Sequence, residues 1–485
     1  MTADLISAPE LALYPHAARH PLGESLHALW QQPLPAGQKG LALDGPTPLP
    51  AWLARRPSVR DGDTGFPLAV LDQGRLLHNA QWMQRFCQHL GVSLAPHGKT
   101  TMSPELFDLQ LQAGAWGITV ATFSQLQAAY RMGVRRLVVA NQIVSGAELR
   151  ALLRLLASDA SLSVMMLVDA LAGVERLRDA LADQPLRGQP NQPHPSHQSL
   201  GVLLELGQPQ GRAGLRDDAA ALDIARAIHA TPGLRLAGLE VYEGLFVTAR
   251  REHDLAGVDA LLARQVRLAQ QLDAAGMFGA QQPQAGDDAQ PPIWLSAGGS
   301  AFFDRVARGL SACPPLSRPH RVLLRSGCYL THDHGFYHGL LDEMAVREPQ
   351  IFAALPPSGL LPALQVWAMV QSRPEPGLAI LTMGKRDASF DIDLPRPLAW
   401  HRPGQPGPMT PVPQLAQEGW RIDRMNDQHA YLRLPPGSAG DIALAVGDIV
   451  ACGISHPCTT FDRWTLLPVC DSDGRVCGAV HTQFG

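Results

Sequence analysis

The chain has 485 residues, of which 46% are hydrophobic, enough to bury the cores of two packed units. Its 40 Lys and Arg residues against 44 Asp and Glu residues give a formal net charge of -4, which offers no basic footprint for a nucleic acid. No apolar stretch is long enough to span a bilayer, and the 7 scattered cysteines favour a reducing cytoplasm over a disulfide scaffold.

Residues 1–60 are rich in proline and weakly periodic, which predicts an irregular N-terminal arm, on the surface or across a partner subunit. The start of this arm lacks the basic residues and apolar run of a secretory signal. From Pro67 the pattern changes, because the apolar run 67–72 predicts a strand and 78–91 predicts a helix that stops at Gly91.

The same alternation of an apolar run and a helical stretch repeats along the next part of the chain. Eight or nine such units predict a closed parallel (β/α)8 barrel, an α/β fold that takes about 250 residues, more than an open sheet. The further strand-like runs are VSLAPHGKT, GITVAT, RLVVAN, LSVMMLVD, LGVLLELG, LAGLEVYEG, PIWLSAGG and RVLLRSG.

Two inserts near 183–199 and 278–292 are rich in Gln and Pro, and they predict solvated loops between elements. After about residue 345 the helix signals thin out and short apolar runs take over, which predicts a second, smaller β-rich C-terminal domain. The expected domains are the arm over 1–60, the barrel over 61–345 and the β-rich domain over 346–485.

Polar residues at the ends of the barrel strands are the first candidates for a functional site, because such sites form where strands end and loops begin. Lys99 lies at such an end, in SLAPHGKTT. A lysine partly desolvated there loses proton affinity and becomes an amine nucleophile, as carbonyl chemistry requires. A solvated loop lysine has the same local pattern, so other strand ends must decide.

The next candidate is SAGGSAFF, where Gly298, Gly299 and Ser300 allow backbone amides and a hydroxyl to approach a phosphate. The following strand end, LRSGCYLTHDHG, offers a second Ser-Gly pair and Tyr329, so two neighbouring loops could share one phosphate. A tight turn also explains the glycines.

His456 and Cys458 flank a proline in the β-rich region. An imidazole and a thiolate two residues apart suit zinc, and the lack of a nearby second pair argues for an open site with room for water or substrate. A turn with a buried cysteine is the commoner outcome for an isolated His-Pro-Cys.

The chain resembles the D-serine dehydratase and D-threonine aldolase group of the alanine racemase-like (fold type III) pyridoxal-phosphate enzymes. The likeness runs from about Pro67 to the end, apart from the two inserts. It implies pyridoxal 5'-phosphate, Zn2+ or another divalent cation, a D-amino acid substrate and a homodimer. The segments that carry it, in this order, are PHGKTT, ITVATFSQL, GQPQGRAG, LSAGGS, LRSGCYLTHDHG and SHPCTTFDRW.

By this resemblance Lys99 binds the cofactor as a Schiff base and removes the substrate's Cα proton. Arg212 hydrogen-bonds the cofactor's phenolic oxygen, and Tyr242 lies near its pyridine nitrogen. His456 and Cys458 match the paired metal ligands. The resemblance also implies a phosphate cradle made of Gly298, Gly299, Ser300, Gly327 and Cys328, with Tyr329 beside it.

The cluster of His332, Asp333 and His334 also has metal-ligand residue types. Adjacent residues in a strand point to opposite faces and could not all bind one ion, so a structural or substrate-side role is favoured.

The resemblance implies β-elimination of D-serine to pyruvate and ammonia, because the cysteine at the second ligand position is typical of the dehydratases. The alternative is aldolase cleavage of a D-β-hydroxy amino acid to glycine and an aldehyde. A pyridoxal-phosphate carrier without turnover also stays open, although such proteins usually lack the β-rich domain.

Overall fold

The computed structural model describes residues 22–183, 199–248, 250–278, 291–412 and 419–484. These residues form two compact units, each assembled from separate stretches of the chain. The barrel unit is made of Gln84–Lys99 and Gly114–Gly327. The β-rich unit is made of the described residues up to Met83, of Thr100–Ala113 and of the residues from Cys328 onward.

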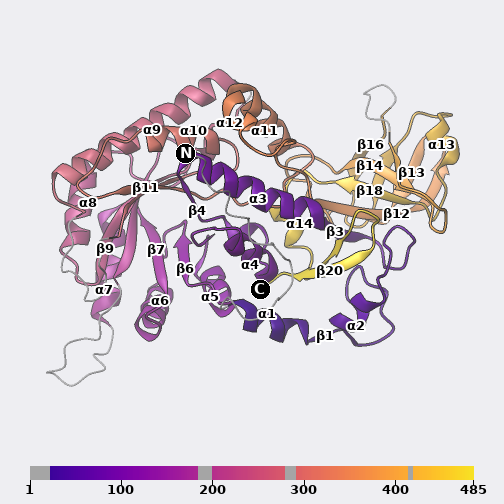
Figure 1. The fold of residues 1–485 in the computed structure, drawn as a ribbon, viewed down its shortest axis with the longest axis horizontal. Helices are drawn as coiled ribbons and strands as arrows, with labels where there is room; N and C mark the ends of the chain where they lie inside the picture. The colour runs from indigo at the N-terminus through magenta and orange to yellow at the C-terminus, as the bar shows by residue number, and fades with distance from the viewer. Residues whose placement is uncertain (1–21, 184–198, 249, 279–290, 413–418, 485) are drawn as a thin grey trace, which may run out of the picture. The chain divides into compact units, whose positions relative to one another are not determined.

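Eight parallel strands form the sheet of the barrel unit, in the order β4-β11-β10-β9-β8-β7-β6-β5 (Figure 1). A parallel bridge between His97 and Thr119 joins the two ends of this order, so the sheet closes on itself and the predicted α/β barrel is confirmed. The strands are β4 (Ser93–Leu94), β5 (Ile118–Val120), β6 (Arg136–Val139), β7 (Ser163–Val168), β8 (Leu200–Leu206), β9 (Leu234–Val241), β10 (Ile293–Ala297) and β11 (His320–Leu324).

The interior of the barrel is a packed core. Trp116 packs against it, with its ring 4.8 Å from that of Trp294. The buried residues of this core are Ala95, Val138, Met165, Leu167, Leu203, Ala237, Trp294 and Leu323.

Helices follow the barrel strands and lie around them (Figure 1). Side-chain caps start two of these helices: Thr122 accepts a hydrogen bond from the Gln125 amide, and Ser145 accepts one from the Glu148 amide. The helices are α5 (Phe123–Arg131), α6 (Gly146–Ser158), α7 (Leu171–Ala182), α8 (Ala219–His229), α9 (Arg251–Ala274) and α10 (Phe303–Ser311), with the short 3-10 helices η1 (Gly98–Thr100) and η2 (Glu243–Phe246).

The β-rich unit is built on one largely antiparallel sheet, which confirms the predicted second domain class. Its long strand β12 pairs with β18, β13 and β3. The strands of this sheet are β3 (Leu68–Asp72), β12 (Leu364–Glu375), β13 (Leu378–Leu381), β14 (Arg396–His401), β15 (Thr410–Pro411), β16 (Arg421–Met425), β17 (Ala430–Arg433), β18 (Ile449–Gly453), β19 (Leu466–Cys470) and β20 (Val476–His481).

Shorter elements complete the chain. Helix α3 (Gln73–Leu90) ends before Gly91, whose φ of +66° suits glycine at a helix stop, as expected from the sequence. The remaining elements are α1 (Leu22–Trp30), β1 (Pro33–Leu34), β2 (Thr47–Pro48), α2 (Leu49–Ala54), α4 (Pro104–Gln112), α11 (Phe336–Arg347), α12 (Pro349–Ala353), α13 (Ala439–Ala443) and α14 (Cys458–Phe461).

The first apolar run of the predicted barrel series, 67–72, does not join the barrel. It forms β3, which pairs antiparallel with β12 and parallel with β19 in the β-rich sheet. The region predicted as an irregular arm contains α1 and α2, which bury Leu26 and Trp52. The inserts expected as solvated loops lie, except at their ends, outside the described residues.

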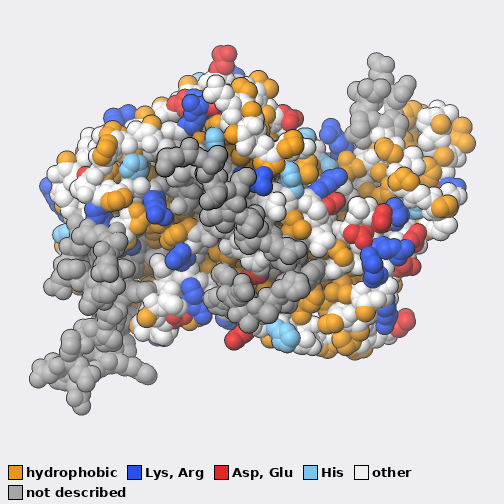
Figure 2. All heavy atoms as spheres, in the orientation of Figure 1, with side chains coloured by type: hydrophobic (Ala, Val, Ile, Leu, Met, Phe, Trp, Pro, Cys, Tyr) orange, Lys and Arg blue, Asp and Glu red, His pale blue; other side chains and the backbone are white. Residues whose placement is uncertain are grey.

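Acidic and basic side chains are interspersed over the described part of the face shown in Figure 2. This mixture agrees with the small net charge of the chain. No helix among the described residues is long and apolar enough to cross a membrane.

Candidate functional site

Lys99 lies in η1, directly after the barrel strand β4, and its side chain is exposed. Two residues earlier, the His97 amide donates to the Arg325 carbonyl (3.0 Å). Burial holds the pKa of His97 well below its usual value, and the positive charges of Lys99, Arg325 and Arg212 lower it further. Lys99 and Arg212, which were predicted separately from the sequence, therefore lie near the same imidazole.

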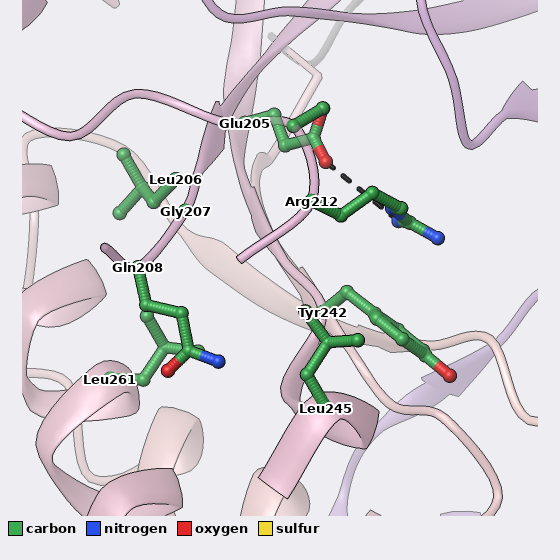
Figure 3. Close-up of a pocket in the computed structure, with 9 residues that line it drawn as sticks. Glu205, Leu206, Gly207, Gln208, Arg212, Tyr242, Leu245 and Leu261 are labelled. Carbon is green, nitrogen blue, oxygen red and sulfur yellow. Dashed lines mark ion pairs between the residues drawn. The ribbon is translucent and has the colours of Figure 1, made fainter. Parts of the chain in front are cut away.

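Arg212 follows β8 and lies over the ring of Tyr242, with the guanidinium carbon 4.8 Å from the ring centroid. Its guanidinium is 3.8 Å from the carboxylate of Glu205 (Figure 3). These three residues line a pocket together with Leu245 and Leu261 (Figure 3). The structure thus brings the predicted Arg212 and Tyr242 into contact.

Glu205 is a buried carboxylate at the end of β8 and accepts a hydrogen bond from Gln142. Burial raises the pKa of Glu205, although the charge of Arg212 and the hydrogen bond from Gln142 oppose that shift. A carboxylate beside the guanidinium limits the directions in which Arg212 can point.

A buried ion pair lies at the same strand ends. Arg325, directly after β11, binds the carboxylate of Glu240 from β9. Arg325 also donates to Ser296 Oγ at 2.6 Å. Burial raises the pKa of Glu240 to about 7, and the charge of Arg325 opposes this shift. One oxygen of Glu240 and Nδ1 of His97 are buried without a hydrogen-bond partner in the described structure.

The predicted phosphate loop has a different partner from the one expected. The amides of Gly298 and Gly299 donate to the two carboxylate oxygens of Glu243, at 3.0 and 2.7 Å. Ser326 Oγ donates to the Gly299 carbonyl at 2.9 Å, so the two predicted phosphate loops contact each other. Ser300 is partly exposed.

Of the second predicted phosphate loop, Gly327 belongs to the barrel unit and Cys328 to the β-rich unit. The Cys328 thiol lies 3.8 Å from the thiol of Cys458. Tyr329 is buried. A role of Cys328 in the cradle would therefore fall to its backbone amide.

His456 lies between β18 and α14, Cys458 is the first residue of α14, and the two side chains contact each other. Nδ1 of His456 is 2.5 Å from the carboxylate of Asp391, which also accepts from Thr459 Oγ1 at 2.8 Å. Burial lowers the pKa of His456, but the contacts with Cys458 and Asp391 outweigh it and raise the pKa to about 9.

The donor set of this pair fits a divalent cation. A carboxylate bound to one imidazole nitrogen orients the ring and leaves the other nitrogen for a metal. Contact with Cys328, and also with His456 and Thr100, lowers the pKa of Cys458 despite burial, and the thiolate is the metal-binding form. In the described ranges no group of three His, Cys, Asp or Glu side chains that could hold a metal ion is found.

The His332, Asp333 and His334 cluster precedes α11 in a turn, not in a strand as the sequence argument assumed. Asp333 accepts hydrogen bonds from the Gly335, Tyr337 and His338 amides, which caps the helix. His332 has a φ of +48° and is buried, with its ring 5.7 Å from that of His338.

Four charged groups of the barrel end were not predicted from the amino-acid sequence: Glu205, Glu240, Glu243 and Arg325. Each lies at or just after the end of a buried apolar strand. A charged residue in that position needs a partner, and this signal is visible in LLELG, LEVYEG and LLRSG.

Two family models match the chain. The model described as alanine racemase, N-terminal domain, matches residues 71–281, and the putative serine dehydratase domain matches residues 363–470. The first spans most of the barrel unit, and the second includes His456 and Cys458.

Among curated proteins, a D-threonine aldolase of Arthrobacter sp. is 26% identical over 415 residues, which cover 84% of this chain and 91% of that protein. A D-threo-3-hydroxyaspartate dehydratase of Delftia sp. (strain HT23) is 27% identical over 261 residues, 51% of this chain and 63% of that protein. The crystal structure of D-threonine aldolase from Filomicrobium marinum superposes with a TM-score of 0.64 at 20% identity, covering 87% of this chain and 95% of that one.

Proposed function

We propose that the chain is a lyase of the fold-type III pyridoxal-phosphate group that converts D-serine to pyruvate and ammonia by β-elimination. The observation that carries this proposal is that Lys99 directly follows the barrel strand β4 and that its charge, like that of Arg212, acts on the buried His97. The His456 and Cys458 pair supports a metal-assisted reaction at a β-hydroxyl.

Several groups at the barrel end fit pyridoxal phosphate. The Lys99 amine is exposed, and Arg212 can donate to the phenolic oxygen. When bound, the cofactor supplies an electron sink for negative charge at the substrate's Cα. Lys99 would take the proton from that carbon, because an amine released there is a base. Glu205 would hold Arg212 in place from the other side.

The metal pair would have a separate role. His456 and Cys458 would hold Zn2+ or another divalent cation, which supplies a Lewis acid toward the substrate's hydroxyl oxygen. Asp391 would keep the His456 ring oriented for binding. The cysteine at this position resembles the dehydratases of the group more than the aldolases.

The second candidate is aldolase cleavage of a D-β-hydroxy amino acid. It is favoured by the D-threonine aldolase of Arthrobacter sp., which aligns over 84% of this chain, more than the dehydratase of Delftia sp. does. The two reactions share the deprotonating and metal-binding groups and differ in the bond that breaks.

The experiment that separates them uses purified protein with pyridoxal phosphate and zinc, supplied with D-serine, D-threonine or D-threo-3-hydroxyaspartate. Keto acid and ammonia from D-serine, lost in Lys99→Ala, support the proposed reaction. If the products are glycine and an aldehyde, the proposed elimination is wrong and the protein is an aldolase. Cofactor binding at Lys99 without any product would point to the carrier class, and L-enantiomers serve as the stereochemical control.

We further propose, from the family resemblance, that the chain works as a homodimer in the cytoplasm on a small-molecule substrate. Light scattering after size exclusion tests the dimer, since a mass of one chain contradicts it.

A further inference from the structure

We infer that Glu243 is a positioning residue for the cofactor's phosphate, because its carboxylate holds the loop Gly298–Ser300 in the shape that binds it. The inference rests on the proposed function, since it concerns the same cofactor. Glu243 would act through this loop and not on the reacting atoms.

The Glu243 carboxylate is bound to the backbone of this loop. The carboxylate is fully buried, and its two oxygens accept from the amides of Gly298 and Gly299 at 3.0 and 2.7 Å. Hydrogen bonds to an ionised acceptor are stronger than those between neutral groups. Because a buried carboxylate is costly without such partners, Glu243 and the loop depend on each other.

The loop needs such an anchor because of its glycines. Gly298 has a φ of +108°, a conformation that side-chain-bearing residues rarely adopt. A Cβ on Gly299 would lie 3.2 Å from the Tyr242 ring and 3.5 Å from the Glu243 carboxylate. Two adjacent glycines leave an unanchored chain with many conformations, which ligand binding would have to restrict. Glu243 restricts them beforehand.

A second tether acts on the opposite side of the same peptide units. Ser326 Oγ donates to the Gly299 carbonyl at 2.9 Å, so the loop is held through its amides by Glu243 and through a carbonyl by Ser326. Arg325, adjacent to Ser326 in the chain, places a positive charge near Glu243.

The arrangement also changes which groups can bind the phosphate. The Gly298 and Gly299 amides are already used by Glu243. In the loop Gly298–Ser300, Ser300 is therefore the residue left to donate to a phosphate. The opposite arrangement, in which phosphate displaces Glu243 from the two amides, makes the carboxylate a competitor and predicts the reverse effect of its removal.

The test compares two aldehydes that differ only in the phosphate. Pyridoxal phosphate and pyridoxal can both react with Lys99, but only the first uses the phosphate loop. Dissociation constants are measured for the wild-type chain and for Glu243→Gln by spectroscopic titration, and borohydride reduction with mass spectrometry locates the adduct. We expect E243Q to raise the dissociation constant of pyridoxal phosphate about 10-fold and that of pyridoxal less than about 2-fold.

The matched control is Glu105→Gln. Glu105 is also a buried glutamate that accepts from a backbone amide, that of His481 at 3.1 Å, but it belongs to the β-rich unit. E105Q should leave both dissociation constants unchanged, even if it lowers the unfolding temperature. If E243Q does not fold, Ser326→Ala removes the other tether, and the same phosphate-selective loss is expected.

If E243Q weakens the binding of both aldehydes equally, the inference is overturned, because this result would indicate general damage to the barrel end. Tighter binding of pyridoxal phosphate would also overturn it and make Glu243 a competitor of the phosphate. If the wild-type chain forms no adduct on Lys99 with either aldehyde, the proposed function fails as well. If the wild-type chain binds pyridoxal phosphate at Lys99 and E243Q binds it with the same dissociation constant, the inference about Glu243 is wrong but the proposed function stands.

Discussion

The barrel end and the segment around His456 place their polar groups under different physical conditions. At the barrel end three glutamates are buried, and each has a partner within the barrel unit: Arg212 for Glu205, Arg325 for Glu240 and two amides for Glu243. The His456 segment instead sets an imidazole against the Cys458 thiol and Asp391, and the Cys328 thiol lies beside that of Cys458.

This difference shows in which part of the site the protein's own groups compensate the buried charges without a ligand. Buried charges at the barrel end are mostly compensated by the chain itself, so they belong to its folding energetics. The His456 and Cys458 pair has the residue types and the orienting carboxylate of a metal site. The buried ion pair of Arg325 and Glu240 should therefore respond to mutation mainly in stability, and the metal pair mainly in ligand affinity.

Removal of Arg325 should have the largest effect on stability. Arg325→Ala leaves Glu240 buried without its partner, so the free energy of unfolding should fall by about 3–5 kcal/mol. Urea denaturation measures this change. The double variant Glu240→Leu with Arg325→Met should recover most of the loss, and a double variant as unstable as R325A would show that the pair is not the cause.

Removal of Asp391 should affect metal affinity next most strongly. Asp391→Ala frees the His456 ring, so zinc affinity should fall about 10- to 100-fold, as is usual when an orienting carboxylate is lost. Competition with a chromogenic chelator measures it. Asp393→Ala, in the same exposed segment, is the matched control. Equal losses of zinc affinity in both variants would show that Asp391 does not orient His456 for metal binding.

Acid should destabilise the β-rich unit through His332. Burial, together with the nearby His338 and His334, lowers the pKa of His332 to about 3. The unfolded chain then binds more protons between about pH 3 and 6.5, so the free energy of unfolding decreases as the pH falls through this window.

His332→Asn should reduce this slope by up to about 1.4 kcal/mol per pH unit, because Asn does not titrate and tolerates positive φ. Urea denaturation at several pH values provides the comparison. His429→Asn, at an exposed histidine, is the control. An unchanged slope in H332N would assign the acid sensitivity to other groups.

The smallest effect on stability is expected for Arg212. Its side chain is 55% exposed, and exposed ion pairs contribute about 0–1 kcal/mol. Arg212→Ala should therefore change the free energy of unfolding by less than about 1 kcal/mol while turnover falls. A large loss of stability would place Arg212 with Arg325 among the groups that hold the barrel end together.

The amino-acid sequence alone was sufficient for the barrel, the β-rich domain and most strand positions, because apolar periodicity reflects burial directly. The strand-end position also pointed to Lys99, since residues at the ends of parallel strands converge at one end of a barrel, whereas Arg212 and Tyr242 were expected only from the resemblance to a known family.

Only the tertiary structure decided which sheet each strand joined and which partner each polar group found. The run 67–72 is as apolar as the barrel strands, yet β3 pairs with β12, almost 300 residues later in the chain. Such pairing depends on contacts remote in sequence, which local pattern does not encode. For the same reason the partners of Glu243, 55 and 56 residues away, and of Cys328, 130 residues away, emerged only from the folded chain.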